Sequence, residues 1–175
     1  METSILLGLI FLVVIAVPIG IYNGLVSRRN SVDNAFASLD ANLQKRFDLI
    51  PNLVATVKGY ATIERDLLEA VVQLRGEALR ANSPAARLHS DGAIAPMMTQ
   101  ILALGESYPE LKASANFGHL QRALTEIEEQ ISASRRAFNA AVNDYNTALE
   151  RFPGNLFASP LGFARRDFYA AAEAS

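Results

Sequence analysis

The sequence contains no cysteine, no tryptophan and only two histidines. The absence of cysteine excludes disulfides, thiolate metal sites and cysteine nucleophiles. Without tryptophan, an aromatic anchor at a membrane surface would have to be Tyr22. Sixteen basic and eighteen acidic residues give a net charge of −2, so no nucleic-acid partner is expected. Glycine and proline are scarce while alanine and leucine are common, which favours an all-α fold.

Residues 5–26, ILLGLIFLVVIAVPIGIYNGLV, carry no charged side chain. About 20 apolar residues suffice to cross a hydrocarbon core of about 30 Å, so residues 1–27 are predicted to be a transmembrane anchor. No basic residue precedes the run and no small-x-small cleavage site stands out after it, which favours an anchor over a cleaved signal peptide. Arg28 and Arg29 follow at once, so the positive-inside rule places the N-terminus outside and the rest of the chain in the cytoplasm.

One face of this predicted anchor carries small residues. Ala16, Gly20 and Gly24 recur at every fourth position, with Asn23 beside them. Small residues let two membrane helices approach closely, and an asparagine can hydrogen-bond across the contact. This pattern favours a homo-oligomer, although glycine and alanine are also common in membrane helices that do not associate.

The longest periodic stretch is 117–152, where apolar residues alternate at spacings of three and four. At 1.5 Å per residue such a helix would be about 54 Å long. Its length alone does not stabilise it in water, so it needs partner helices. We therefore expect residues 28–152 to form an antiparallel up-and-down helical bundle. The seam consists of Phe117, Leu120, Leu124, Ile127, Ile131, Ser134, Phe138, Ala141, Tyr145, Ala148 and Phe152.

A second apolar stripe, from Leu25 to Ile50, continues from the anchor without a stop signal. It predicts one helix that leaves the bilayer and becomes the first helix of the bundle. Pro51 is expected to end or kink that helix. A further helical pattern then runs from Leu53 to Leu74, with a weak point at Gly59 and Thr62.

The remaining segments are marked by turn residues. Asn82-Ser83-Pro84 predicts a stop followed by a loop up to Gly92, and a shorter helix is expected from Ile94 to Glu106. Ser114 or Asn116 is the expected N-cap of the long helix, which Pro153-Gly154 ends. Residues 153–175 hold many large apolar side chains, so this tail is expected to dock on the bundle, on a second subunit or on the membrane surface.

Two polar sets are candidates for structural or interaction sites. The first surrounds Pro51 and consists of Arg46, Asp48, Asn52, Lys58 and Tyr60. Such side chains can cap the backbone groups freed at a helix break, and a binding site is the alternative. The second set is Asn139, Asn143 and Asn146, which share one helix face. Because asparagine disfavours helix interiors, this set predicts interhelical bonds or a partner surface, against a merely polar outer face.

No catalytic, metal or cofactor site is expected. His89 and His119 each lack a second histidine at helical spacing, so a zinc site is not indicated. The acidic residues of the helices lack the Glu-x-x-His pairs of a di-metal bundle site. There is no glycine-rich phosphate loop and no Gly-x-Ser-x-Gly. The sequence therefore does not indicate an enzyme.

Three stretches carry a family resemblance: Tyr22 to Phe36, Leu43 to Arg75, and Tyr145 to Phe163. With Asp-Leu-Ile-Pro-Asn-Leu-Val at 48–54 and Lys-Gly-Tyr at 58–60, they resemble the LemA family of bacterial membrane proteins. The resemblance implies one N-terminal membrane helix with the N-terminus outside, an antiparallel helical bundle, and a place in the bacterial inner membrane. Phe36 and Phe47 stand where the family often has tryptophan and tyrosine.

Members of this family have been linked to magnetosome formation and to neighbouring membrane-protease genes. Two functional hypotheses follow. The first is a membrane-anchored scaffold or adaptor that self-associates at the bilayer and has no catalytic activity. The alternative is a regulatory or accessory subunit of a membrane enzyme such as a membrane protease.

Overall fold

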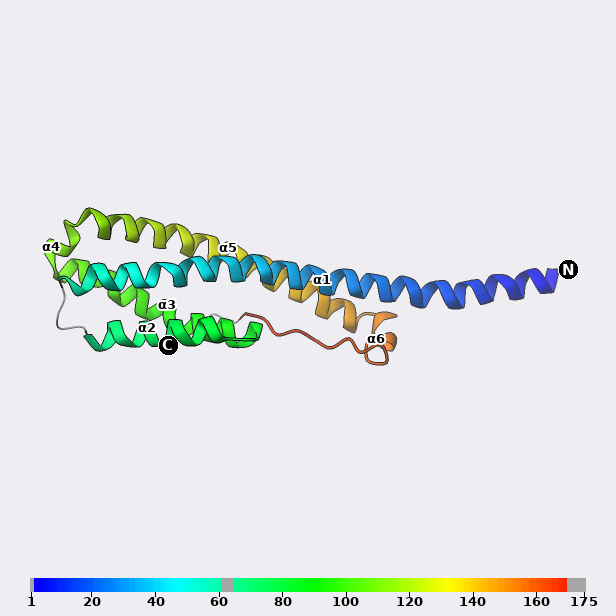
Figure 1. The fold of residues 1–175 in the computed structure, drawn as a ribbon. Helices are drawn as coiled ribbons and strands as arrows, with labels where there is room; N and C mark the ends of the chain where they lie inside the picture. Colours follow the sequence, from blue (N-terminus) through cyan, green and yellow to red (C-terminus); the bar gives the residue numbers. More distant parts are fainter. Residues whose placement is uncertain (1, 61–64, 170–175) are drawn as a thin grey trace. The chain divides into compact units, whose positions relative to one another are not determined.

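The computed structural model describes residues 2–60 and 65–169. Within these ranges the chain forms helices and no strand (Figure 1). The helices are α1 (Glu2–Lys58), α2 (Arg65–Arg80), α3 (Pro84–Ser107), α4 (Pro109–Lys112), α5 (Ala115–Glu150) and α6 (Gly154–Phe157). The predicted all-α fold is confirmed, and so is the single helix that carries the apolar N-terminal segment into the bundle.

The N-terminal part of α1 is apolar and uncovered. Helix α1 is 57 residues long, and those large apolar side chains that the structure describes between Ile5 and Ile19 are 45–68% exposed. Its most apolar 18-residue window has a mean hydropathy of 2.8 and no buried residue. Among the described residues, α1 is the one helix long and apolar enough to cross a membrane by these criteria.

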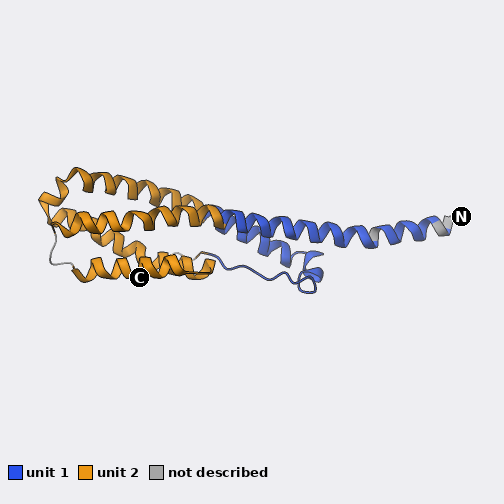
Figure 2. Ribbon diagram, in the orientation of Figure 1, with its two compact units in different colours: residues 1–35, 136–168 blue, residues 36–135, 169–175 orange. Residues whose placement is uncertain are grey.

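The chain divides into two compact units (Figure 2). Unit 1 comprises residues 1–35 and 136–168, and unit 2 comprises residues 36–135 and 169–175. Helices α1 and α5 each contribute one part to each unit. The two units are described separately below.

Unit 2 is the up-and-down part of the bundle. Asn42 Nδ2 of α1 donates to Ser134 Oγ of α5 at 2.8 Å, and Lys45 Nζ donates to Gln130 Oε1 at 3.3 Å. Because the α5 partner moves back along the chain as the α1 residue moves forward, the two helices are antiparallel. Helix α2 packs on α3. The fully buried side chains of this core include Leu39, Leu43, Phe47, Ile50, Leu53, Leu68, Val71, Ile94, Ile101 and Leu111.

Unit 1 combines α1 up to Ala35 with α5 from Arg136 onward, α6 and the tail to Phe168. The tail lies against these helices: the Tyr145 hydroxyl donates to the Ala164 carbonyl at 3.0 Å, and the Phe163 ring meets Tyr22 edge-on at 5.7 Å between centroids. Its buried apolar side chains are Leu25, Val32, Phe138, Val142, Tyr145, Leu149, Ala158 and Phe163.

The predicted loop at 84–92 is wrong, because this stretch is the beginning of α3. Ser83 Oγ accepts the N–H of Ala86 at 3.2 Å, and Pro84 occupies the first turn, where its missing donor is harmless. The Ser-Pro pair that marks the end of one helix therefore also starts the next. Gly92 and Pro96 lie inside α3.

The long predicted helix exists with slightly different ends. Ser114 Oγ accepts the N–H of Phe117 at 3.4 Å at its start, as expected for an N-cap. Phe152 is not part of the seam, because α5 ends at Glu150 and the Phe152 ring is 78% exposed. The pattern after Leu53 also divides differently, since α1 extends to Lys58 and α2 begins at Arg65. The predicted weak point at Thr62 lies outside the described residues.

Candidate functional site

Helix α1 does not end at Pro51, which is one of the two expected outcomes, but continues to Lys58. A proline inside a helix leaves the carbonyl four residues earlier without its N–H donor, here the carbonyl of Phe47. That carbonyl accepts a hydrogen bond from Arg75 Nε of α2 at 2.7 Å. A side chain 28 positions away therefore replaces the donor that Pro51 lacks.

The polar residues predicted to cap a break at Pro51 make other contacts or lie exposed. Asp48 accepts a hydrogen bond from Gln44 at 2.8 Å, and the Asn52 carbonyl accepts one from Thr56 at 2.8 Å. Lys58 and Tyr60 are exposed at the end of α1. Arg46 is buried and points to other helices.

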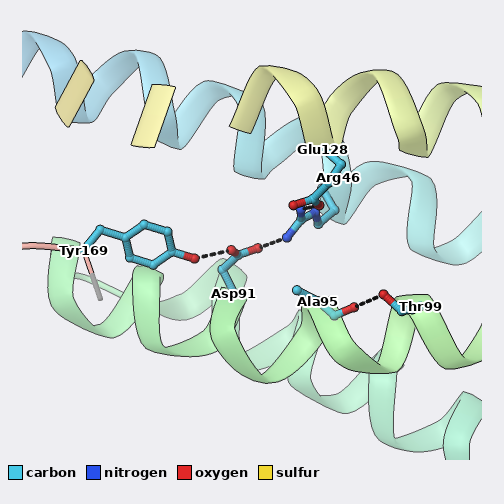
Figure 3. Close-up of polar contacts among 6 residues, drawn as sticks. All are labelled: Arg46, Asp91, Ala95, Thr99, Glu128 and Tyr169. Atoms are coloured by element: carbon cyan, nitrogen blue, oxygen red, sulfur yellow. Dashed lines mark hydrogen bonds and ion pairs between the residues drawn. The ribbon is translucent and has the colours of Figure 1, made fainter. Parts of the chain in front are cut away.

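Arg46 and Asp91 are the centre of a buried polar network in unit 2 (Figure 3). Arg46 is 3% exposed and Asp91 is 1% exposed, and their nearest side-chain atoms are 2.6 Å apart. Arg46 also pairs with Glu128 of α5. The Tyr169 hydroxyl donates to the second oxygen of Asp91 at 2.8 Å. The network thus joins α1, α3, α5 and the C-terminal tail through four side chains.

The electrostatics of this network keep Tyr169 protonated. Burial, followed by the charge of Asp91 and its hydrogen bond, raises the pKa of the Tyr169 phenol well above its usual value. The guanidinium of Arg135 lies over the Tyr169 ring at 5.6 Å from its centroid. The phenol is therefore a hydrogen-bond donor to Asp91 throughout the physiological pH range.

Arg87 of α3 is a second buried guanidinium in unit 2. It donates to the Asp40 carboxylate at 2.7 Å, to the Gln44 side chain at 2.6 Å and to the Ala78 carbonyl at 2.8 Å. Its guanidinium also lies 5.1 Å from the centroid of the Phe47 ring. Arg87 therefore connects α3 to α1 and to the end of α2.

Both networks are suited to holding helices in register. Among the described residues, every buried side-chain nitrogen or oxygen has a hydrogen-bond partner. Both oxygens of the Asp91 carboxylate are bound by side chains of the same chain, and the Arg46 guanidinium is bound to two carboxylates. Fully satisfied buried networks of this kind specify packing. Within the described ranges, no group of three His, Asp or Glu side chains could hold a metal ion.

The three asparagines of α5 differ in burial. Asn146 is 4% exposed and makes two hydrogen bonds with the Arg166 backbone. Its Nδ2 donates to the Arg166 carbonyl at 2.8 Å, and its Oδ1 accepts the Arg166 N–H at 3.0 Å. Asn143 is exposed, and Asn139 is half-buried. Asn146 thus holds the tail of unit 1 against α5, and its two hydrogen bonds do not go to another helix.

The predicted small-residue face of α1 lies along an open groove in unit 1 with a volume of about 1150 Å³. Ala16, Gly20 and Gly24 line it from α1, while Asn143 and Ala148 line it from α5. Ala16 and Gly20 remain exposed, and a Cβ added at Gly20 would meet no atom within 4 Å. Asn23 is exposed and does not line this groove. The chain therefore leaves open space beside residues 16–20.

Sequence reasoning missed most of the buried network. Arg87 and Asp91 occupy the same helical stripe as Ile94, Met98 and Ile101, at spacings of three and four. Charged residues in an otherwise apolar stripe are the signal that could have found them. The turn residues on either side, Asn82-Ser83-Pro84 and Gly92, instead made the start of α3 look like a loop. Tyr169 had no such signal, because the tail is not periodic.

Three relatives are similar to the chain at low identity. Magnetosome protein MamQ of Magnetospirillum gryphiswaldense is 22% identical, and the alignment covers 85% of this chain and 64% of that protein. Magnetosome protein MamQ 2 of Paramagnetospirillum magneticum gives the same figures. Protein LemA of Metamycoplasma hominis is 22% identical over 90% of this chain and 72% of that protein. The chain thus spans 64% of the length of the MamQ relatives.

The family comparison covers nearly the whole bundle. The model of the LemA family matches residues 35–175, which include all of unit 2. The match also includes the part of unit 1 contributed by α5, α6 and the tail. The resemblance found in the sequence is confirmed, and the chain belongs to the LemA family.

Proposed function

We propose that this protein is a membrane-anchored scaffold or adaptor without catalytic activity, whose copies associate through the anchor. The observation that carries the proposal is the continuity of α1. Its N-terminal part exposes apolar side chains from Ile5 to Ile19, and the same helix supplies fully buried residues such as Leu43 and Phe47 to unit 2. A helix shared in this way connects an anchor to a folded domain without a flexible linker.

The relatives support a role other than a reaction, because the names of MamQ and LemA state no enzymatic activity. The polar network supports the same proposal, since its side chains are already bonded to one another. We propose that the anchor lies in the bacterial inner membrane with the N-terminus outside, because Arg28 and Arg29 directly follow the apolar run. Protease added outside spheroplasts should then leave the bundle intact, and its digestion would reverse the orientation.

The association surface proposed is the face formed by Ala16, Gly20, Asn23 and Gly24. Three of these residues, Ala16, Gly20 and Asn23, are exposed. Gly20 is open, because a Cβ added there would meet no atom within 4 Å. Close contact between two such faces would gain van der Waals packing, and Asn23 could hydrogen-bond across it.

The test is the mass of the full-length protein in mild detergent, measured by light scattering. Gly20→Leu should lower the mass toward that of a monomer, because the leucine side chain separates the two helices. Gly8→Leu is the matched control: it adds the same volume at another open position, about 120° around the helix. A monomeric wild-type protein would contradict self-association. A monomer that copurifies with a membrane protease would favour the accessory-subunit alternative.

A further inference from the structure

The candidate membrane span and the end of α5 lie side by side in unit 1. The groove of this unit is lined by Leu12, Ala16 and Gly20 of α1 and, opposite them, by Phe152, Pro153 and Gly154. The Phe163 ring contacts Tyr22, and the guanidinium of Arg29 lies over the same ring at 5.5 Å. Residues that follow α5 therefore reach the level of Tyr22, inside the apolar run of α1.

The part of α1 beyond this contact is short for a bilayer. Ile5 to Ile21 is a run of 17 residues, which rises about 25 Å at 1.5 Å per residue. The hydrocarbon core is about 30 Å thick, and the headgroup layers add several more ångströms on each side. If α1 spans the core, the chain segment beside Tyr22 is at the depth of the upper acyl chains and headgroups.

Three large side chains exposed on the segment that follows α5 are apolar, which is suited to the depth of the upper acyl chains. Phe152 is 78% exposed, Leu156 is 60% exposed and Leu161 is 42% exposed. In water each exposes a large apolar surface, which is unfavourable by about 25 cal/mol for every Å² left uncovered. Arg28 and Arg151 line the same groove, and arginines at this level can extend to lipid phosphates while their stems remain among apolar groups.

We propose that Phe152, Leu156 and Leu161, here named the apolar collar, insert into the interface of the bilayer beside the anchor. The occupant of this surface is lipid, because Phe152 lines the groove together with Leu12 and Ala16 of the apolar run, and Leu156 and Leu161 belong to the same short segment that ends at the Tyr22 contact. The inference rests on the anchoring part of the proposed function, and it does not depend on self-association. It gives unit 1 a second attachment to the membrane and so restricts the tilt of this unit relative to the bilayer.

The test uses the full chain, reconstituted into vesicles of equal parts phosphatidylcholine and phosphatidylglycerol. Because the sequence has no cysteine, a single introduced cysteine carries a polar fluorophore at one defined position. The positions are Leu156→Cys in the collar, Leu12→Cys in the anchor and Leu79→Cys as the matched control. Leu79 is an exposed leucine of α2 in unit 2, at 40% exposure. Quenching by lipids with a nitroxide near the top of the acyl chain reports insertion.

The proposal expects at least twofold stronger quenching at Leu156→Cys than at Leu79→Cys, with Leu12→Cys quenched as well. Quenching at Leu12→Cys but only the Leu79→Cys level at Leu156→Cys would overturn the collar and leave the anchor in place. No quenching at Leu12→Cys would overturn the anchoring and the collar together.

Discussion

The bond from Arg75 to the Phe47 carbonyl predicts that the effect of Arg75→Met depends on Pro51. In the natural sequence, Pro51 supplies no N–H, and Arg75 Nε is the donor to that carbonyl at 2.7 Å. Arg75→Met removes the donor and keeps much of the apolar stem. Pro51→Ala restores the ordinary backbone N–H inside the helix. The two changes therefore act on the same acceptor.

The size of the effect follows from the surroundings of this carbonyl. Phe47 is fully buried, so losing the hydrogen bond to its carbonyl should lower the free energy of unfolding by about 1–3 kcal/mol. Arg75 retains 27% side-chain exposure, so water can reach the site in part and the lower half of that range is expected. The second contact of Arg75, 3.9 Å from the exposed Asp48 carboxylate, adds little.

In the Pro51→Ala background, the same Arg75→Met change should lower stability by less than about 1 kcal/mol, because the alanine N–H then occupies the carbonyl. The difference between the two backgrounds is the coupling energy of the cycle. Thermal melting followed by far-UV circular dichroism measures it, since about 1 kcal/mol shifts the Tm by about 2–4 °C for a chain of this length. Arg80→Met, an exposed arginine in the same helix, is the control. An equal loss in both backgrounds would refute the role of Arg75 as the replacement donor.

Two further predictions concern the buried network of unit 2. Asp91→Leu alone should destabilise the protein by about 3–5 kcal/mol, because it leaves the buried Arg46 charge with only the exposed Glu128 as a partner. Combining Asp91→Leu with Arg46→Met should recover most of that loss, because no buried charge then remains unpaired. Thermal melts of the natural protein and the two variants measure this, and no recovery in the double variant would contradict the charge argument. The raised pKa of Tyr169 stabilises the fold below the unfolded-state pKa of about 10, and the contribution disappears as the pH rises toward the folded-state pKa. Tyr169→Phe should therefore show a shallower loss of stability in alkaline solution, and parallel pH profiles of variant and natural protein would exclude this role.

Much of the helical architecture could be predicted from the sequence because it rests on local periodicity. The seam of α5 is visible in spacings of three and four, and Phe117, Ile131 and Phe138 are buried as expected. The continuity of α1 from its apolar segment into the bundle follows from the absence of any stop signal between Leu25 and Ile50. These features depend on residues close together in the sequence, so the sequence alone predicts them.

Two of the wrong predictions, at Pro51 and at the start of α3, concern elements whose contacts come from residues distant in sequence. Pro51 predicts an end or a kink, whereas α1 continues to Lys58 with Arg75 bound to the Phe47 carbonyl. The first turns of α3 resemble a loop because turn residues lie on either side, and the burial of Arg87 and Asp91 there is explained by partners on α1 and in the tail. A local pattern cannot show a partner from another helix, so it misplaces the elements that such partners stabilise.

The side chains that maintain the fold differ from those that are exposed and can contact a partner. The charges around Asp91 are bonded to one another and buried, so they can set the register of helices but have little left to offer another molecule. Unit 1, beside its exposed charges, leaves three apolar or small-residue surfaces uncovered: the anchor, the face around Gly20 and the apolar collar. Uncovered apolar surface is the part of a molecule that lipid or a second helix can still bury. Changes at Asp91 should therefore alter stability, whereas changes at Gly20 should alter association without unfolding either unit.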